Sequence, residues 1–205
     1  MIDSIRLPVR PDAVYYLLYK PIDVISTTAD ERGRRTVTDL VPSSPRVYPV
    51  GRLDADSEGL LILTNDGDLT HHLTHPRFGV TKTYMALVSG RFTPRQARQL
   101  ETGVMLDDGV ATAAAARVID VGVEGSLLEL VMTEGRNREV RRMVAAVGHE
   151  VVRLVRTAVG DLKDRDLQSG SWRHLSLPEV RRLYAIGSDS EMAWDNAADS
   201  EIDNE

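Results

Sequence analysis

The stretch Tyr48 to Gly67, YPVGRLDADSEGLLILTNDG, places a turn dense in carboxylates directly before an apolar run. The apolar run, residues 60–63, has the length of a strand and is closed by the turn signal at residues 65–67. Gly51 and Gly59 bracket the acidic turn, and glycine tolerates positive φ and a close backbone approach. The pattern predicts a tightly bent loop, anchored to a buried strand, that projects Arg52, Asp54, Asp56, Ser57 and Glu58.

Three interpretations of these acids are open from the residues alone. Asp54, Asp56 and Glu58 can cap turns and face water, as loop acids commonly do. They can open a calcium-binding loop, although its twelfth position holds Asn65 where a bidentate Glu is required. One of them can do covalent or acid–base chemistry at a sugar-like centre, which needs an ionised acid beside a cation in a pocket that limits water. Arg52 or a later arginine could be that cation.

Four other segments stand out along the chain: LLYKP (residues 17–21), KTYMALVSG (82–90), EGRNREVRRM (134–143) and GHEVVRLVR (148–156). Together with GRLDADSEGLLILTNDG (51–67), they resemble the signature of the RsuA-type ribosomal RNA pseudouridine synthases, over residues 15 to 184. The resemblance implies that the chain isomerises a specific uridine of ribosomal RNA, with 23S large-subunit rRNA preferred over 16S. It also implies that the uridine is flipped out of its stack, because a stacked base cannot be reached.

The resemblance also assigns roles to individual residues. Asp54 stands in the place of the catalytic aspartate, Arg141 in the place of the arginine that pairs with it, and Tyr84 in the place of the tyrosine that stacks beside the target base. Glu139 departs from the pattern, since similar proteins mostly have Gln there. The catalytic residues predicted in this way are Asp54, Tyr84 and Arg141, and the substrate-binding residues are Arg52, Lys20, Lys82, Val140, Arg136 and Arg138.

The order of strand and helix signals predicts an α+β fold with a mixed, mainly antiparallel sheet and flanking helices, because regular βαβ alternation is missing. The resemblance adds two lobes around a central cleft. We expect a linker at residues 1–13, a catalytic domain at 14–186 and an acidic, disordered tail at 187–205. Similar proteins usually carry an S4-type RNA-binding domain ahead of the catalytic domain, and residues 1–13 are too few for one.

A second informative segment runs from Glu134 to Gly148, and within it residues 138–147 have the spacing of a helix. The spacing of its apolar residues gives a core-facing stripe, and the spacing of its arginines gives a separate face. These arginines form a basic patch that either faces water or contacts RNA. The apolar stripe is Val140, Met143, Val144 and Val147, and the arginine face carries Arg138, Arg141 and Arg142.

The net charge of −6 argues at first sight against a polyanionic partner. Seven of the 31 acidic residues, however, fall between Gly187 and Glu205, where no Lys or Arg occurs, so the body of the chain is close to neutral. Within that body the basic residues cluster, which is the pattern expected of RNA contact. One cluster is Arg32, Arg34 and Arg35, and the other is Arg136, Arg138, Arg141, Arg142, Arg153 and Arg156.

The composition bounds the remaining possibilities. The chain of 205 residues has 42% apolar content and no cysteine, so it can bury a core without disulfides or thiolate metal sites. His71 and His75 have metal-ligand spacing, but no third ligand lies nearby in the sequence. The opening residues lack the apolar region of a secretory signal, and no run is long enough to span a membrane. We therefore expect a cytoplasmic monomer that needs no cofactor or metal.

Two other functions remain as alternatives. A noncatalytic rRNA-binding or ribosome-assembly module of the same fold would keep the basic clusters but would not require Asp54. A glycoside hydrolase could use Asp54 with Asp56 or Glu58, but its sugar cleft should be rich in aromatic side chains. The aromatic content of 5% is low for that function.

Overall fold

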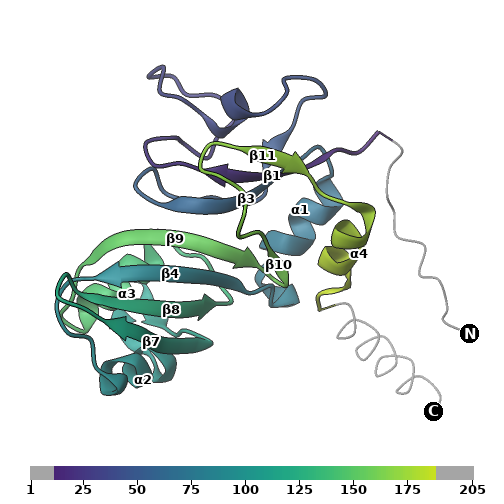
Figure 1. Cartoon of the computed structure of the whole chain (residues 1–205). Coiled ribbons are helices and arrows are strands. Elements are labelled where there is room, and N and C mark those ends of the chain that lie inside the picture. The colour runs from purple at the N-terminus through teal and green to yellow at the C-terminus, as the bar shows by residue number, and fades with distance from the viewer. Residues whose placement is uncertain (1–11, 188–205) are drawn as a thin grey trace, which may run out of the picture.

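The computed structural model describes residues 12–187 and contains two groups of strands with helices packed against them (Figure 1). The strands are β1 (Tyr15–Lys20), β2 (Tyr48–Pro49), β3 (Glu58–Thr64), β4 (Lys82–Val88), β5 (Val104–Leu106), β6 (Gly109–Ala111), β7 (Ala115–Val121), β8 (Ser126–Met132), β9 (Val151–Val159), β10 (Leu162–Lys163) and β11 (Trp172–His174). The helices are α1 (Gly67–Thr74), α2 (Pro94–Thr102), α3 (Glu139–Ala146) and α4 (Leu177–Ala185), with 3-10 turns η1 (Val37–Leu40) and η2 (Pro76–Phe78).

The main sheet has the strand order β11-β1-β3-β9-β4-β8-β7, with β2 paired to β3 and β10 paired to β9. The pairing of β3 with β9 is parallel, and every other pairing of the described strands is antiparallel. Strands β11, β1 and β3 form the first lobe, and strands β9, β4, β8 and β7 form the second (Figure 1). The predicted α+β fold with a mixed, mainly antiparallel sheet is therefore confirmed.

The two lobes are joined by a very short parallel contact between β3 and β9. It involves only two register pairs, Glu58 with Val155 and Gly59 with Arg156. Gly59 has φ +111, and a Cβ added there would lie 2.3 Å from the carbonyl oxygen of Arg156. Only glycine allows the strands to approach this closely, so Gly59 sets the distance between the lobes at the point where the acidic turn enters β3.

Strand β3 is buried along its whole length because both of its faces are covered. Leu60 and Ile62 pack on one face against α1 and α4, and Leu61 and Leu63 pack on the other against the segment that leads from β1 to β2. The alternation of side chains along a strand explains how one apolar run serves two cores. The acidic turn before β3 is thus held by a rigid strand.

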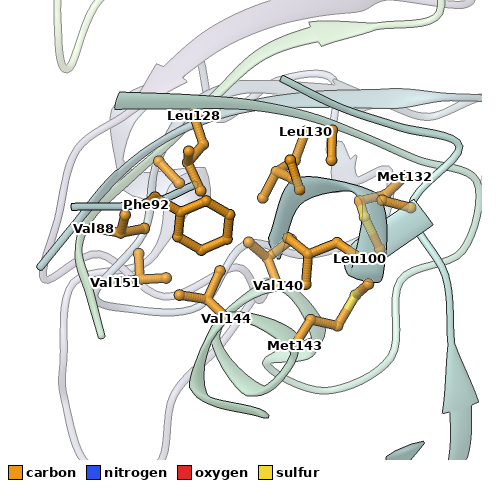
Figure 2. Close-up of a cluster of buried hydrophobic side chains, with 14 of the residues drawn as sticks. Val88, Phe92, Leu100, Leu128, Leu130, Met132, Val140, Met143, Val144 and Val151 are labelled. Atoms are coloured by element: carbon orange, nitrogen blue, oxygen red, sulfur yellow. The ribbon is translucent and has the colours of Figure 1, made fainter. Parts of the chain in front are cut away.

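A separate core fills the second lobe between its sheet and the helices α2 and α3. In Figure 2, Val140 and Val144 of α3 point toward Phe92 and the side chains of β8. Met143 and Val144 are fully buried, as the predicted apolar stripe requires. This packing fixes the orientation of α3, whose other face carries the arginines.

The helix expected from the spacing of residues 138–147 is present as α3, but Arg138, which was placed on its arginine face, lies just before it as the N-cap residue. Arg138 has φ 49 and ψ 30, a left-handed conformation that cannot be part of an α-helix, and residues 134–138 form a loop instead. Strands β5 and β6 form a hairpin in which Leu106 pairs with Gly109. The linker at residues 1–13 and the acidic tail at 187–205 fall almost wholly outside the described residues.

Candidate active site

A cavity of about 270 Å³ opens beside Asp54, and both lobes contribute to its wall. The acidic turn supplies one side, and β4, β8, β9, the loop before α3 and the start of α3 supply the other. We call this cavity the Asp54 chamber. Its lining residues are Arg52, Leu53, Asp54, Ser57, Tyr84, Met132, Glu134, Gly135, Arg136, Asn137, Arg138, Glu139, Val140 and Leu154.

Backbone hydrogen bonds hold the acidic turn in place. The hydroxyl of Ser26 donates to the carbonyl of Leu53 at 2.8 Å and accepts from the amide of Leu53 at 3.0 Å. The amide of Ser57 donates to the carbonyl of Asp54 at 3.1 Å, which closes the turn. Asp54 is half-buried and its carboxylate borders the chamber, so this acid is presented by a fixed backbone rather than by a free loop.

Lys20 lies beneath the same turn and is completely buried. Its ammonium group donates to the carbonyls of Ser57 (2.7 Å), Asp54 (3.0 Å) and Pro21 (3.0 Å). Burial lowers the pKa of Lys20 to about 8, against the opposing effect of the Asp54 and Asp56 charges. We expected Lys20 to bind substrate, but an ammonium group without exposed surface cannot reach one. Lys20 instead clamps the turn.

The resemblance implied that Arg141 pairs with the carboxylate of Asp54, but the structure does not show this pair. Its guanidinium donates to the carbonyls of Asp56 (2.8 Å) and Val151 (2.9 Å), and its Nε lies 3.4 Å from the Asp56 carboxylate. Asp56 also accepts a bidentate pair of hydrogen bonds from Arg138, at 3.1 and 2.9 Å. These hydrogen bonds from Arg138 hold the pKa of Asp56 below its usual range. Asp56 therefore forms ion pairs with both arginines. Asp54 makes no side-chain ion pair within 4 Å among the described residues.

The conformation of Arg138 is a second sign that this wall is specialised. An arginine in the left-handed region is uncommon, and such strain persists only where surrounding contacts impose it. Here the contacts are the bidentate pair with Asp56 and the start of α3 directly after Arg138. The strained backbone brings the guanidinium across from the second lobe to the acidic turn of the first.

The chamber also has an aromatic and apolar wall opposite the turn. Tyr84 on β4 is half-buried, and Val140 at the start of α3 is 6% exposed. Met132 and Leu154 complete this wall. A planar ring can stack on a tyrosine face and contact aliphatic side chains, so the wall suits an unstacked nucleobase.

A second cavity, also of about 270 Å³, adjoins the first and shares four lining residues with it. We call it the Lys82 chamber, after the lysine at the start of β4 that borders it. Arg52, predicted to bind substrate, is exposed and lines both chambers. The shared residues are Arg52, Tyr84, Glu134 and Gly135.

Most of the arginines in the second basic cluster are neutralised by carboxylates from other parts of the chain. Arg136 pairs with Glu134, and Arg142 makes a bidentate pair with Asp108. Arg153 donates to Glu58 at 2.6 Å. The expected strongly basic face is therefore largely compensated, and the predicted substrate contact through Arg136 competes with an existing pair. In the first cluster, Arg34 is likewise paired with Asp30 at 2.6 Å.

Glu139, noted only as a departure from the family pattern, is 4% exposed in the chamber wall. Its Oε2 accepts from the amide of Arg136 at 3.1 Å, but its Oε1 has no hydrogen-bond partner. Burial, reinforced by the neighbouring Glu134, raises the pKa of Glu139 to about 7. Sequence reasoning missed this acid pair, although Glu134 and Glu139 frame the same short loop and are both acidic.

Two further findings concern metal binding and membrane spans. Among residues 12–187, no group of three His, Cys, Asp or Glu side chains could hold a metal ion. No helix in that part of the chain is long and apolar enough to cross a membrane.

Comparison with known proteins gives the class and then the family. A crystal structure titled pseudouridylate synthase superposes with a TM-score of 0.73 at 28% identity, covering 83% of this chain and 74% of that one. The two-lobed fold with an acidic turn facing an aromatic wall is therefore that of an isomerase acting on uridine. The family model described as RNA pseudouridylate synthase matches residues 14–146, and the chain belongs to this family.

Two curated relatives are similar over most of their length. The chain is 44% identical over 188 residues to ribosomal large subunit pseudouridine synthase B of Bacillus subtilis, covering 90% of this chain and 77% of the relative. It is 40% identical over 173 residues to ribosomal large subunit pseudouridine synthase E of Vibrio vulnificus, covering 78% of this chain and 74% of the relative. The family resemblance drawn from the sequence motifs is confirmed.

Proposed function

We propose that this protein converts a specific uridine of large-subunit ribosomal RNA into pseudouridine, with Asp54 as the catalytic carboxylate. The observation that carries the proposal is the placement of Asp54: its turn is clamped by Lys20 and Ser26, and it borders a chamber whose far wall contains Tyr84 and Val140. The names of the two curated relatives support large-subunit rRNA as the substrate. The same proposal includes a cytoplasmic location and action as a monomer.

The reaction breaks the bond between N1 of uracil and C1′ of ribose, turns the base, and joins C5 to C1′. The proton lost from C5 is balanced by the proton gained at N1, so no net redox change occurs. Asp54 can attack C1′, add to the ring, or remove a ribose proton, and each route starts from the ionised carboxylate. The backbone clamp on the turn keeps this oxygen nucleophile in one place, which is how positioning lowers a barrier.

Tyr84 and Arg52 are proposed to handle the base rather than the sugar. Tyr84 would stack on the detached uracil while it turns, and Val140 would limit its movement from the side. Arg52, exposed at the mouth of the chamber, would occupy the space that the uridine leaves in the RNA. Arg141 would act through the backbone of Asp56 and so position Asp54 indirectly.

The test is release of tritium from C5-labelled uridine in transcribed large-subunit rRNA, followed by mapping of the pseudouridine formed. The wild-type protein should release tritium from one main position, and Asp54→Asn should lower turnover at least about a thousandfold while binding the RNA with similar affinity. Asp68→Asn, which changes an exposed acid in α1, is the matched control and should keep full activity. Normal turnover by Asp54→Asn would refute the catalytic assignment and favour a noncatalytic RNA-binding module.

A further inference from the structure

The Lys82 chamber has a charge distribution that the chemistry at Asp54 does not explain. Its polar wall contains the cations Arg52, Lys82 and Arg156, together with the single carboxylate Glu134. That carboxylate is already engaged, because Arg136 donates to both of its oxygens at 3.1 Å. The chamber thus has three cations and no available anion among its lining residues.

Lys82 is the clearest example of a cation in this chamber without an anionic partner. It is partly buried at the start of β4, and its ammonium group has no hydrogen-bond or ion-pair partner among the described residues. Burial and the nearby Arg156 charge lower the pKa of Lys82 to about 8, and no carboxylate opposes that effect. A partly buried ammonium group that borders a cavity and has no anionic partner favours an anion from outside the chain.

Arg156 supplies the second cation in a similar state. It is 4% exposed, and within residues 12–187 its guanidinium donates only to carbonyls, those of Leu60 at 2.7 Å and Arg52 at 3.5 Å. The other arginines of the same cluster that lie near the acidic turn have carboxylate partners, as Arg138 and Arg153 do. Arg156 is therefore a fixed, uncompensated charge beside Lys82.

The rest of the lining of the Lys82 chamber is largely apolar. These side chains come from the segment before β3, from β3 itself, from the end of α1, from η2 and from β9. A cavity lined by cations and by an apolar wall fits a nucleotide, whose phosphate needs cations and whose base has an apolar face. The apolar lining residues are Val50, Ile62, Leu73, Pro76 and Val159.

We propose that the Lys82 chamber binds the nucleotide next to the target uridine, with its phosphate at Lys82 and Arg156 and its base against the apolar wall. The two chambers share Arg52 and Tyr84, so an RNA strand that places a uridine beside Asp54 continues directly into the second chamber. The inference rests on the proposed function, since it takes single-stranded RNA as the ligand. It assigns to Lys82 the recognition of one phosphodiester, distinct from the chemistry at Asp54.

The experiment measures binding of a fluorescent oligouridylate to proteins that all carry Asp54→Asn, so that turnover does not enter. Adding Lys82→Gln should weaken binding about tenfold and lower the slope of log K against log salt by about 0.7, the value for one lost phosphate contact in a single strand. Lys82→Arg should keep the slope. Lys163→Gln, which removes an exposed lysine of β10, should behave like the parent.

Two further measurements locate the contact. Replacing one phosphate of the oligouridylate by a neutral methylphosphonate should weaken binding to the parent most at one position. The effect at that position should be smaller with Lys82→Gln, in which only Arg156 remains to contact the phosphate. Inorganic phosphate should compete far more weakly than the oligouridylate, because it lacks a base for the apolar wall. Thermal melting of each variant shows whether it is folded.

The proposal is overturned if Lys82→Gln and Lys163→Gln give equal salt slopes, or if inorganic phosphate binds as tightly as the oligouridylate. If Lys82→Gln does not fold, the methylphosphonate series on the parent decides, and equal binding at every position overturns the proposal. A further outcome is that Lys82→Gln lowers the salt slope as predicted while the wild-type protein releases no tritium. That result would support the phosphate site and reject pseudouridine formation. The two ideas therefore fail separately.

Discussion

The two chambers share a wall but differ in how their charges are balanced. In the Asp54 chamber, Arg138 and Arg141 both contact Asp56, and Arg136 contacts Glu134. In the Lys82 chamber, Lys82 and Arg156 have no carboxylate partner among the described residues. Paired arginines in a wall fix its shape, whereas unpaired cations attract an anionic ligand. Residues that hold the acidic turn are thus distinct from those that we propose bind RNA.

The largest expected effect comes from Gly59→Ala, which acts on both chambers at once. The added Cβ would meet the backbone of Arg156 at 2.3 Å, so β3 and β9 must separate and the lobes must shift. We expect a loss of at least about 3 kcal/mol in the free energy of unfolding, measured by urea denaturation. Gly33→Ala is the control, since Gly33 has φ +68 but nothing within 4 Å of its Cβ position. Similar losses in both variants would show that the close approach is unimportant.

Asp56→Asn should leave cations without a carboxylate partner beside the Asp54 chamber, as in the Lys82 chamber. The substitution removes the anion shared by Arg138 and Arg141, so the acidic turn loses its tether and two cations are freed. We expect kcat to fall about tenfold, while RNA binding becomes tighter and more dependent on salt. Single-turnover rates and binding titrations measure the two effects. Unchanged kcat together with unchanged salt dependence would contradict the assigned role of Asp56.

Glu139→Gln tests the acid pair in the shared wall. The pKa of Glu139 is raised from 4.5 to about 7, so the folded state binds more protons than the unfolded state between these values. The contribution to stability is therefore fully present below about pH 4.5 and is lost as the pH rises through about 7.

The variant should remove this dependence and be more stable than wild type by about 1 to 2 kcal/mol at pH 8, with little difference at pH 5. The groups that face Glu139 are Glu134 and Arg136 in the loop before α3 and Arg142 within α3. Urea denaturation across this pH range measures the effect. Parallel pH profiles for the two proteins would rule out a raised pKa.

The smallest effect is expected from Arg142→Gln. Arg142 makes a bidentate pair with Asp108 at 2.8 and 3.0 Å, on the outer side of the wall. Because its charge is already compensated at the surface, its loss should change the dissociation constant for the oligouridylate by less than about twofold. The salt slope should also stay constant, in contrast to Lys82→Gln. A slope reduced as much as in Lys82→Gln would show that paired arginines also contact RNA.

Much of this architecture is predictable from local sequence. The acidic turn before β3, the strand itself and the core stripe of α3 follow from the period of apolar residues and from turn residues, which act over short distances. The placement of Asp54, Tyr84 and Val140 around one chamber agrees with the family motifs. The spacing placed Arg138 on the helix, but it precedes α3 in a left-handed conformation and pairs with Asp56, a residue 82 positions away, which local sequence does not indicate.

What the sequence alone determined is the set of elements and the residues with the chemistry for uridine isomerisation. Only the tertiary structure decided which charges are compensated. It paired Arg138 with Asp56 and Arg153 with Glu58, and it left Lys82 and Arg156 without an anionic partner in the part of the chain that the structure describes. It also buried Lys20, which we expected to bind substrate, beneath the acidic turn. The reason is physical: hydrophobic periodicity is local, whereas an ion pair or a burial cost depends on groups that folding brings together from distant positions.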